Sequence, residues 1–149
     1  MTASKYYIPR IFITDDSQIF ITSVQKILSE RNRYSVCGTS LSGDEALLKI
    51  KETHPDIAII DIQMPDTSGT EVIAQIRRMN FPLKILAVSV CEEGETIARA
   101  LKAGADGYLS KLRGIEQLIY VIEKLLDGES YFTDVAIILS NQNTTTLRN

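Results

Sequence analysis

The run Ile57-Ala58-Ile59-Ile60-Asp61 is uninterrupted apolar sequence that ends in a carboxylate. A short run of this kind is typical of a strand in a parallel sheet, where both faces are covered by helices. Comparable β-branched or apolar runs occur at four other places, Arg10 to Thr14, Tyr34 to Thr39, Lys84 to Val88 and Gly107 to Leu109. The sequence therefore predicts five strands, of which residues 57–60 form the third.

The stretches between these strands carry apolar residues at helical spacing. The predicted helix faces are Phe20, Val24, Ile27 and Leu28; Ala46, Leu47 and Ile50; Val72, Ile73 and Ile76; Ile97, Ala100 and Leu101; and Leu118, Val121, Ile122 and Leu125. Capping boxes mark two helix starts, Ser42 with Glu45 and Ser68 with Glu71. Strands and helices that alternate in this way predict an α/β fold built around an open parallel sheet.

Size and charge restrict the class of protein. A chain of 149 residues, 44% of them hydrophobic, predicts one domain, which we place at residues 1–128. Residues 129–149 are expected to form a short helix, from Tyr131 to Ser140, and the start of a linker. The net charge of −3 gives no basic field for nucleic acid. No apolar stretch has the length of a membrane span, so a cytoplasmic location is expected.

Polar residues occur where the predicted strands end. Asp15 and Asp16 follow the first strand and Asp61 the third, while Ser89 follows the fourth and Lys111 lies just beyond the fifth. Ligands of open α/β sheets bind at the carboxyl ends of the strands, so these side chains are expected to meet in one site. The sequence thus predicts one acidic pocket.

Three carboxylates in one pocket repel one another and need a cation. An all-oxygen ligand set favours Mg²⁺, whereas zinc is disfavoured because neither cysteine nor His54 belongs to the set. A carboxylate can attack phosphorus to give an aspartyl phosphate. Lys111 would supply a point charge for the transferred oxygens and Ser89 a hydroxyl donor.

At these residues the sequence resembles the receiver domain of bacterial response regulators. The matching motifs are Asp15-Asp16, Asp61-Ile62-Gln63-Met64-Pro65 with Gly69, Ser89, and Tyr108-Leu109-Ser110-Lys111, over about residues 11–126. The resemblance implies a flavodoxin-like (βα)5 fold, with a five-stranded sheet of order 2-1-3-4-5 and helices on both faces. It also implies a phosphorylation switch that is driven by a histidine kinase.

The resemblance assigns a role to each site residue. Asp61 would be the phosphoacceptor, and Asp15 and Asp16 would hold Mg²⁺ together with Asp61 and the backbone carbonyl of Gln63. Lys111 would contact the phosphoryl oxygens. Ser89 and Tyr108 would be the switch hydroxyl and the switch aromatic, and phosphotransfer and slow hydrolysis would be self-catalysed.

Finer features are similar to the NarL/FixJ, or LuxR-type, subfamily: the run from Gly104 to Leu109 and the run from Gly128 to Phe132. That resemblance implies control of transcription and DNA contact through a C-terminal helix-turn-helix domain, which does not follow in this chain. Ser17 and Leu112 depart from the usual subfamily residues, and we expect them to alter phosphate lifetime or partner choice. The exposed margin of the last predicted helix is a candidate surface for a second copy of the chain, so a homodimer stays an open alternative.

The same residues have other interpretations. Asp61 could be a turn carboxylate, Asp15 or Asp16 a helix cap, Lys111 a solvated lysine and Tyr108 ordinary core packing. An aspartate-nucleophile phosphatase needs a second acid two residues after the nucleophile, where Gln63 stands. A dinucleotide-binding domain is disfavoured, because this chain has no GxGxxG motif after a predicted strand. An interaction module independent of phosphorylation would not need the complete acidic set.

Overall fold

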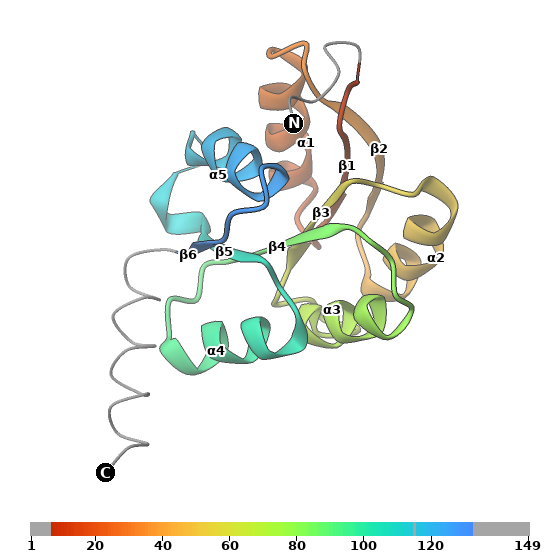
Figure 1. Cartoon of the computed structure of the whole chain (residues 1–149). Helices are drawn as coiled ribbons and strands as arrows, with labels where there is room; N and C mark the ends of the chain where they lie inside the picture. The colour runs from red at the N-terminus through yellow and green to blue at the C-terminus, as the bar shows by residue number, and fades with distance from the viewer. Residues whose placement is uncertain (1–6, 115, 133–149) are drawn as a thin grey trace.

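A parallel sheet forms the middle layer of the computed structural model, which describes residues 7–114 and 116–132 (Figure 1). Within these residues the sheet has six strands in the order β2-β1-β3-β4-β5-β6. The strands are β1 (Arg10–Thr14), β2 (Ser35–Ser40), β3 (Ile57–Asp61), β4 (Lys84–Ser89), β5 (Gly107–Ser110) and β6 (Tyr131–Phe132). The predicted order of the first five strands is confirmed.

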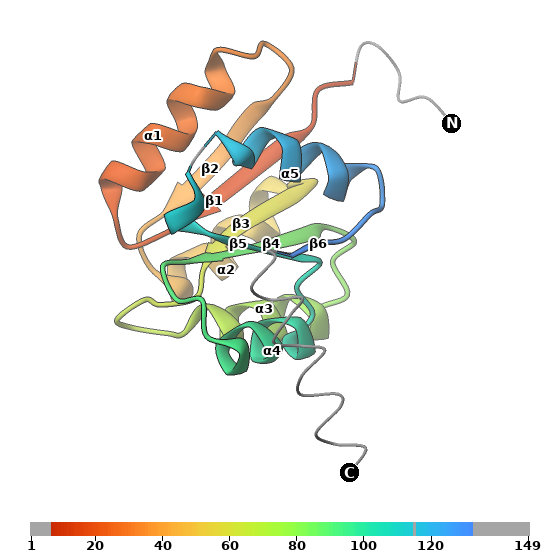
Figure 2. The ribbon, with the colours of Figure 1, turned by 90° about the vertical axis from the view of Figure 1, so that its left-hand side faces the viewer.

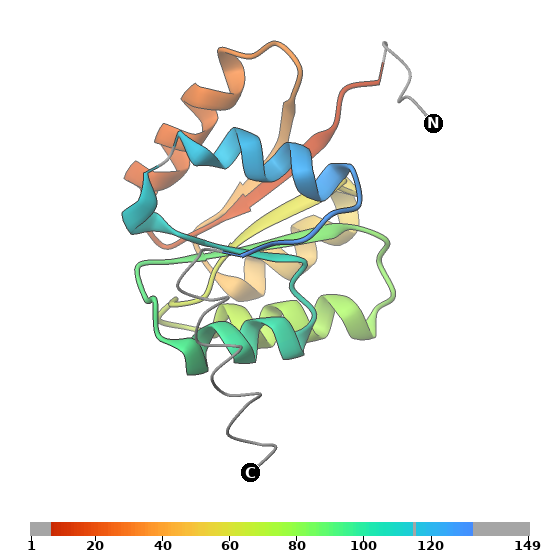
Figure 3. The same cartoon turned by 60° about the vertical axis from the view of Figure 1, so that its left-hand side comes forward.

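Helices cover both faces of the sheet, as predicted (Figures 2 and 3). The helices α1 (Gln18–Ser29) and α5 (Gln117–Leu126) lie on one face. The other face carries α2 (Gly43–Thr53), α3 (Gly69–Arg78) and α4 (Gly94–Ala103). The layers explain why β3 is apolar throughout: Ile57 and Ile59 pack toward α1 and α5, and Ala58 and Ile60 toward the three other helices.

Both predicted capping serines begin their helices. Ser42 Oγ accepts from Glu45 N at 3.3 Å, and Ser68 Oγ accepts from Glu71 N at 3.2 Å. A cap of this kind is worth about 1 kcal/mol. The loop after β2 ends where α2 begins, and the loop after β3 ends where α3 begins. The two caps therefore fix the ends of these loops at the carboxyl edge of the sheet.

A short turn precedes α5, and the chain after α5 differs from the sequence prediction. Lys111 begins the single 3₁₀ turn η1 (Lys111–Arg113). The helix expected from Tyr131 is wrong in its first two residues, because Tyr131–Phe132 form β6 and pair with Gly107 and Tyr108. The free edge of β5 supplies the partners that a two-residue strand needs. The remainder of that expected helix lies outside the described residues.

None of the helices in the described part of the chain has the length and apolar character that crossing a membrane requires. That finding agrees with the absence of a long apolar stretch in the sequence.

Candidate functional site

The acidic residues predicted at the strand ends do converge. Asp15 directly follows β1, and Asp61 is the last residue of its neighbour β3. Together with Asp16 they offer three carboxylate oxygens that all lie within 4.8 Å of one another. Asp15 and Asp61 are buried, at 0% and 4% exposure, whereas Asp16 faces solvent. Asp16 is therefore the solvent-facing member of the cluster.

Asp15 is held in place by its own loop. Its Oδ1 accepts from the backbone N of Ser17 at 2.9 Å. The Ser17 hydroxyl in turn accepts from Phe20 N at 3.2 Å and is the N-cap of α1. Neither Asp15 nor Asp16 caps this helix, which settles one alternative left open by the sequence. Ser17, an atypical residue in the resemblance, thus shapes the site without lending a ligand oxygen.

Lys111 places its ammonium group between the two buried carboxylates. Its Nζ lies 2.6 Å from Asp15 Oδ2 and 3.5 Å from Asp61 Oδ2. The fully buried Asp15 Oδ2 has no hydrogen-bond donor of good geometry, so this ion pair is the interaction that the structure gives it. The alternative that Lys111 is an ordinary solvated lysine is wrong, since its side chain is only 18% exposed.

The crowded site changes the acidity of Asp61. Burial, and after it the neighbouring Asp15 carboxylate, raise the pKa of Asp61 to about 7. The Gln63 N–H, which donates to Asp61 Oδ1 at 3.1 Å, and Lys111 act in the opposite direction. One ammonium does not neutralise three carboxylates, so the cluster has a deficit of positive charge.

These residues fit a hard divalent cation. The donor set is carboxylate oxygen throughout, and the buried Asp15 Oδ2 has an unmet acceptor capacity. Magnesium prefers oxygen ligands and is commonly held by one or two carboxylates plus water and phosphate oxygens. Asp15, Asp16 and Asp61 would hold such an ion, and its charge would remove the deficit.

Ser89 and Tyr108 belong to one chain of hydrogen bonds beside this cluster. Ser89 Oγ donates to Gln63 Oε1 at 3.3 Å and accepts from Cys91 N at 3.0 Å. The Tyr108 hydroxyl donates to the Cys91 carbonyl at 2.6 Å. Tyr108 is fully buried, and burial raises its pKa to about 12. The end of β4 is therefore tied to Gln63 in the loop after Asp61, and the loop after β4 is tied to Tyr108 in β5.

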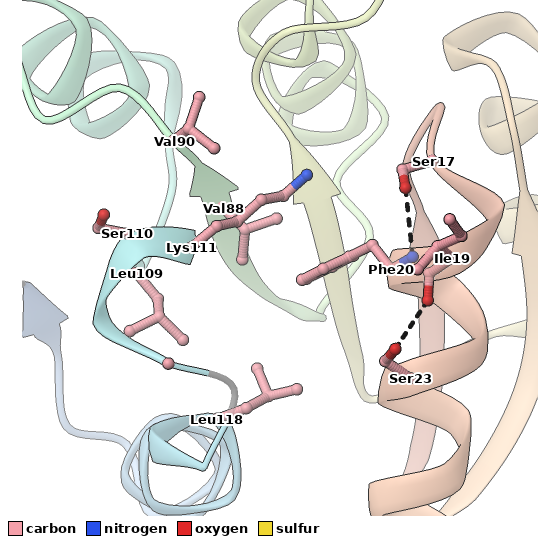
Figure 4. A pocket seen from close by; sticks show the side chains of 11 residues that line it. Ser17, Ile19, Phe20, Ser23, Val88, Val90, Leu109, Ser110, Lys111 and Leu118 are labelled. Atoms are coloured by element: carbon pink, nitrogen blue, oxygen red, sulfur yellow. Dashed lines mark hydrogen bonds between the residues drawn. The ribbon is translucent and has the colours of Figure 1, made fainter.

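Two contributors to the site were not predicted from sequence. The Cys91 carbonyl is a backbone group, which residue type does not reveal. Phe20 was assigned to the core face of α1, yet its ring lies beneath the Lys111 ammonium, 4.4 Å from Nζ to the ring centroid. Phe20 lines a pocket of about 470 Å³ whose walls also include Val90 and Lys111 (Figure 4).

The chain is similar in sequence to known proteins. The family described as response regulator receiver domain matches residues 11–123. Response regulator GacA of Pseudomonas protegens is 33% identical over 124 residues, which is 83% of this chain and 58% of that protein. The uncharacterized transcriptional regulatory protein YvfU of Bacillus subtilis is 32% identical, over 83% of this chain and 62% of that protein. The chain thus spans less than two thirds of these relatives.

Solved structures show the same architecture. A LuxR family two-component response regulator from Aurantimonas superimposes with a TM-score of 0.85 at 27% identity, covering 93% of this chain and 99% of the other. The signal receiver domain of the putative response regulator NarL from Mycobacterium tuberculosis has a TM-score of 0.78 at 30% identity, covering 82% and 98%. The fold of this chain thus also occurs in solved structures of response regulators.

Proposed function

The chain belongs to the response regulator receiver domain family, and from that premise we propose that it accepts a phosphoryl group on Asp61 from a histidine kinase with the help of Mg²⁺. The observation that carries the proposal is the pocket in which Asp61, two further carboxylates and the Lys111 ammonium meet. Receiver domains of this family are signalling switches, and the transfer would be catalysed by the domain itself.

In the proposed transfer, an oxygen of Asp61 attacks the phosphorus of a phosphohistidine. The new O–P bond forms as the N–P bond breaks, and the electron pair of that bond stays on the imidazole nitrogen, which takes up a proton. Bound Mg²⁺ supplies positive charge to the carboxylates and to the phosphoryl oxygens. Lys111 Nζ, already 3.5 Å from Asp61 Oδ2, is placed to neutralise charge on the transferred group.

The switch would follow from the hydrogen bonds of the β4–α4 loop. A phosphoryl group on Asp61 offers new acceptors to the Ser89 hydroxyl, which now donates to Gln63. Movement of Ser89 would disturb the Cys91 backbone and so the hydroxyl contact of Tyr108. We propose that these two residues convert phosphorylation into a shift between two conformations.

Several wider properties are proposals that rest on the family. They are the backbone carbonyl of Gln63 as a further Mg²⁺ ligand, a cytoplasmic location, and a division into a receiver at residues 1–128 and a linker segment at 129–149. Control of transcription through a helix-turn-helix domain outside this chain is proposed from the LuxR-type relatives. A homodimer through the margin of α5 is proposed as well, where Tyr120 is 54% exposed.

The test is phosphorylation by a small donor, phosphoramidate, with Mg²⁺, followed by intact-mass measurement. The wild-type chain should gain one phosphoryl group and Asp61→Asn should gain none. Asp127→Asn should behave as wild type, because this exposed carboxylate lies at the C-terminal end of α5 and outside the cluster of Asp15, Asp16 and Asp61. An unchanged mass of the wild type, or equal labelling of Asp61→Asn, would remove the proposal.

A turnover assay on a generic phosphate ester, run beside the labelling, separates the phosphatase alternative. Gln63, at the position where such an enzyme needs a second acid, has an amide that cannot donate a proton as a general acid; its oxygen accepts from Ser89. We expect stoichiometric labelling and no sustained turnover of a generic phosphate ester.

A further inference from the structure

The Lys111 ammonium has a third neighbour besides its two carboxylates. It lies over the face of the Phe20 ring, 4.4 Å from the centroid. Figure 4 shows Phe20 extending from the first turn of α1 toward Lys111, which reaches across from the end of β5. The ammonium thus has carboxylates at 2.6 and 3.5 Å and the ring as a further contact.

The ring is placed there by the start of α1. Phe20 N donates to the Ser17 hydroxyl, which fixes the backbone of Phe20 three residues after the cap. The Phe20 side chain is half-buried and packs at the margin of the core between the sheet, α1 and α5. A side chain in this position is held on one side by the core and meets Lys111 on the other.

The contact restricts a side chain that is otherwise free to move. Lysine has a flexible four-carbon stem and a compact charge, so a carboxylate alone fixes its direction weakly. An aromatic face attracts a cation without offering a hydrogen-bond acceptor that competes with carboxylates. The attraction is stronger where water is partly excluded, and Lys111 is 18% exposed.

We propose that Phe20 is a positioning residue for phosphoryl transfer, whose ring face holds the Lys111 ammonium beside Asp61. This inference rests on the proposed function, because it concerns the group that would neutralise charge on the transferred phosphoryl. Phe20 touches no reacting atom: it acts through Lys111. A ring that served only as core packing would be replaceable by any apolar side chain of similar size.

The rate of phosphorylation by phosphoramidate with Mg²⁺ tests the role. Phe20→Leu keeps an apolar side chain but lacks the ring, and we expect it to slow labelling about three- to tenfold. Phe20→Tyr keeps the ring and should stay within about twofold of the wild type. A ring-fluorinated phenylalanine at position 20 keeps the shape, weakens the negative face, and should slow labelling as well. Ile19→Ala is the control, since Ile19 is 82% exposed.

A second measurement needs neither phosphate nor metal. A ring face near the end of a lysine shifts the NMR signals of its ε-protons upfield. We expect this shift for Lys111 in the wild type and in Phe20→Tyr, and its loss in Phe20→Leu. Equal rates for the wild type, Phe20→Leu and the fluorinated chain, or an ordinary Lys111 signal in the wild type, would overturn the inference and leave the proposed function intact. A wild type that takes up no phosphoryl group would remove both.

Discussion

At the scale of single residues, Gly69 packs closely against the backbone at the end of β3. It is the first residue of α3, and its N donates to the carbonyl of Ile62 at 3.0 Å. A Cβ at this position would overlap the backbone carbonyl oxygen of Asp61 and would lie 2.7 Å from Ile62 Cα. Backbone atoms cannot rotate away, so the end of β3 keeps its position only if residue 69 has no side chain.

We therefore expect Gly69→Ala to destabilise the fold by about 2 kcal/mol and to slow phosphorylation of Asp61. Gly43→Ala is a matched control, because Gly43 is also the first residue of a helix with a serine cap. The nearest atoms to its Cβ are side-chain atoms, Val72 Cγ2 at 2.8 Å and Thr67 Cβ at 3.0 Å, which have more freedom to shift. Urea unfolding and the labelling rate would be compared, and equal losses in both variants would contradict this explanation.

The same scale shows what sequence reveals about a site. Asp15, Asp61 and Lys111 were predictable because parallel strands bring their carboxyl ends to one edge, so position along the strand fixes position in space. Phe20 was predicted only as core, since helical spacing does not tell which part of a ring faces a cation. The hydrogen bond from Tyr108 to the Cys91 carbonyl depends on a loop conformation that no side-chain pattern encodes.

At the scale of elements, some helix caps could be predicted from the sequence and one could not. Ser42 and Ser68 were predicted because a glutamate follows each at the third position. Ser17 is an equal cap, but its third following residue is Phe20, so the sequence lacked that signal. The cap of α1 fixes the turn that carries Phe20 and contacts Asp15 through its backbone.

Removing the Ser17 hydroxyl tests this coupling. Ser17→Ala should lower the free energy of unfolding by about 1 kcal/mol, as should Ser42→Ala, since each removes one capping bond. Ser17→Ala should in addition slow phosphorylation by phosphoramidate, because the first turn of α1 presents Phe20 to Lys111. Ser17→Asn keeps a capping oxygen and should recover both properties. If Ser42→Ala slowed labelling as much as Ser17→Ala, general loss of stability would be the better explanation.

The edge strand β6 depends on a second close approach. A Cβ at Gly107 would lie 2.8 Å from the Tyr131 carbonyl oxygen and 3.2 Å from Leu125 Cδ2. A strand of two residues has too little sequence for its period to be recognised, which is why the sequence prediction placed a helix there. The position of β6 was set instead by the edge of β5.

We expect Gly107→Ala to displace β6 while leaving the rest of the sheet paired. Amide hydrogen exchange is the measurement: protection at Tyr131 and Phe132 should fall, and protection in β3 and β4 should remain. Gly128→Ala is the comparison, because nothing lies within 4 Å of its Cβ and only its φ of +87° opposes a side chain. Unchanged protection of β6 in Gly107→Ala would show that the strand tolerates the methyl group.

At the scale of the whole molecule, an apolar sheet covered on both faces ends in a cluster of buried charge. The core contributes stability at any pH, but the cluster does not. The pKa of Asp61 is raised from an ordinary 3.8 to about 7, first by burial and then by Asp15. Between these values the folded chain binds more protons than the unfolded chain, so the free energy of unfolding must decrease as pH rises. The contribution is full below pH 4 and lost above about pH 7.

The metal-free chain should accordingly be about 2 kcal/mol less stable at pH 8 than Asp61→Asn, which cannot ionise there, and the difference should shrink toward pH 5. Mg²⁺ binds the folded cluster and should raise the melting temperature of the wild type more at pH 8 than at pH 5, where protons compete for the carboxylates. Thermal unfolding across this range is the measurement, with Asp127→Asn as the exposed control whose pH profile should match the wild type. A wild-type profile parallel to that of Asp61→Asn, with no response to Mg²⁺, would mean that Asp61 ionises normally and that its pocket does not concentrate negative charge.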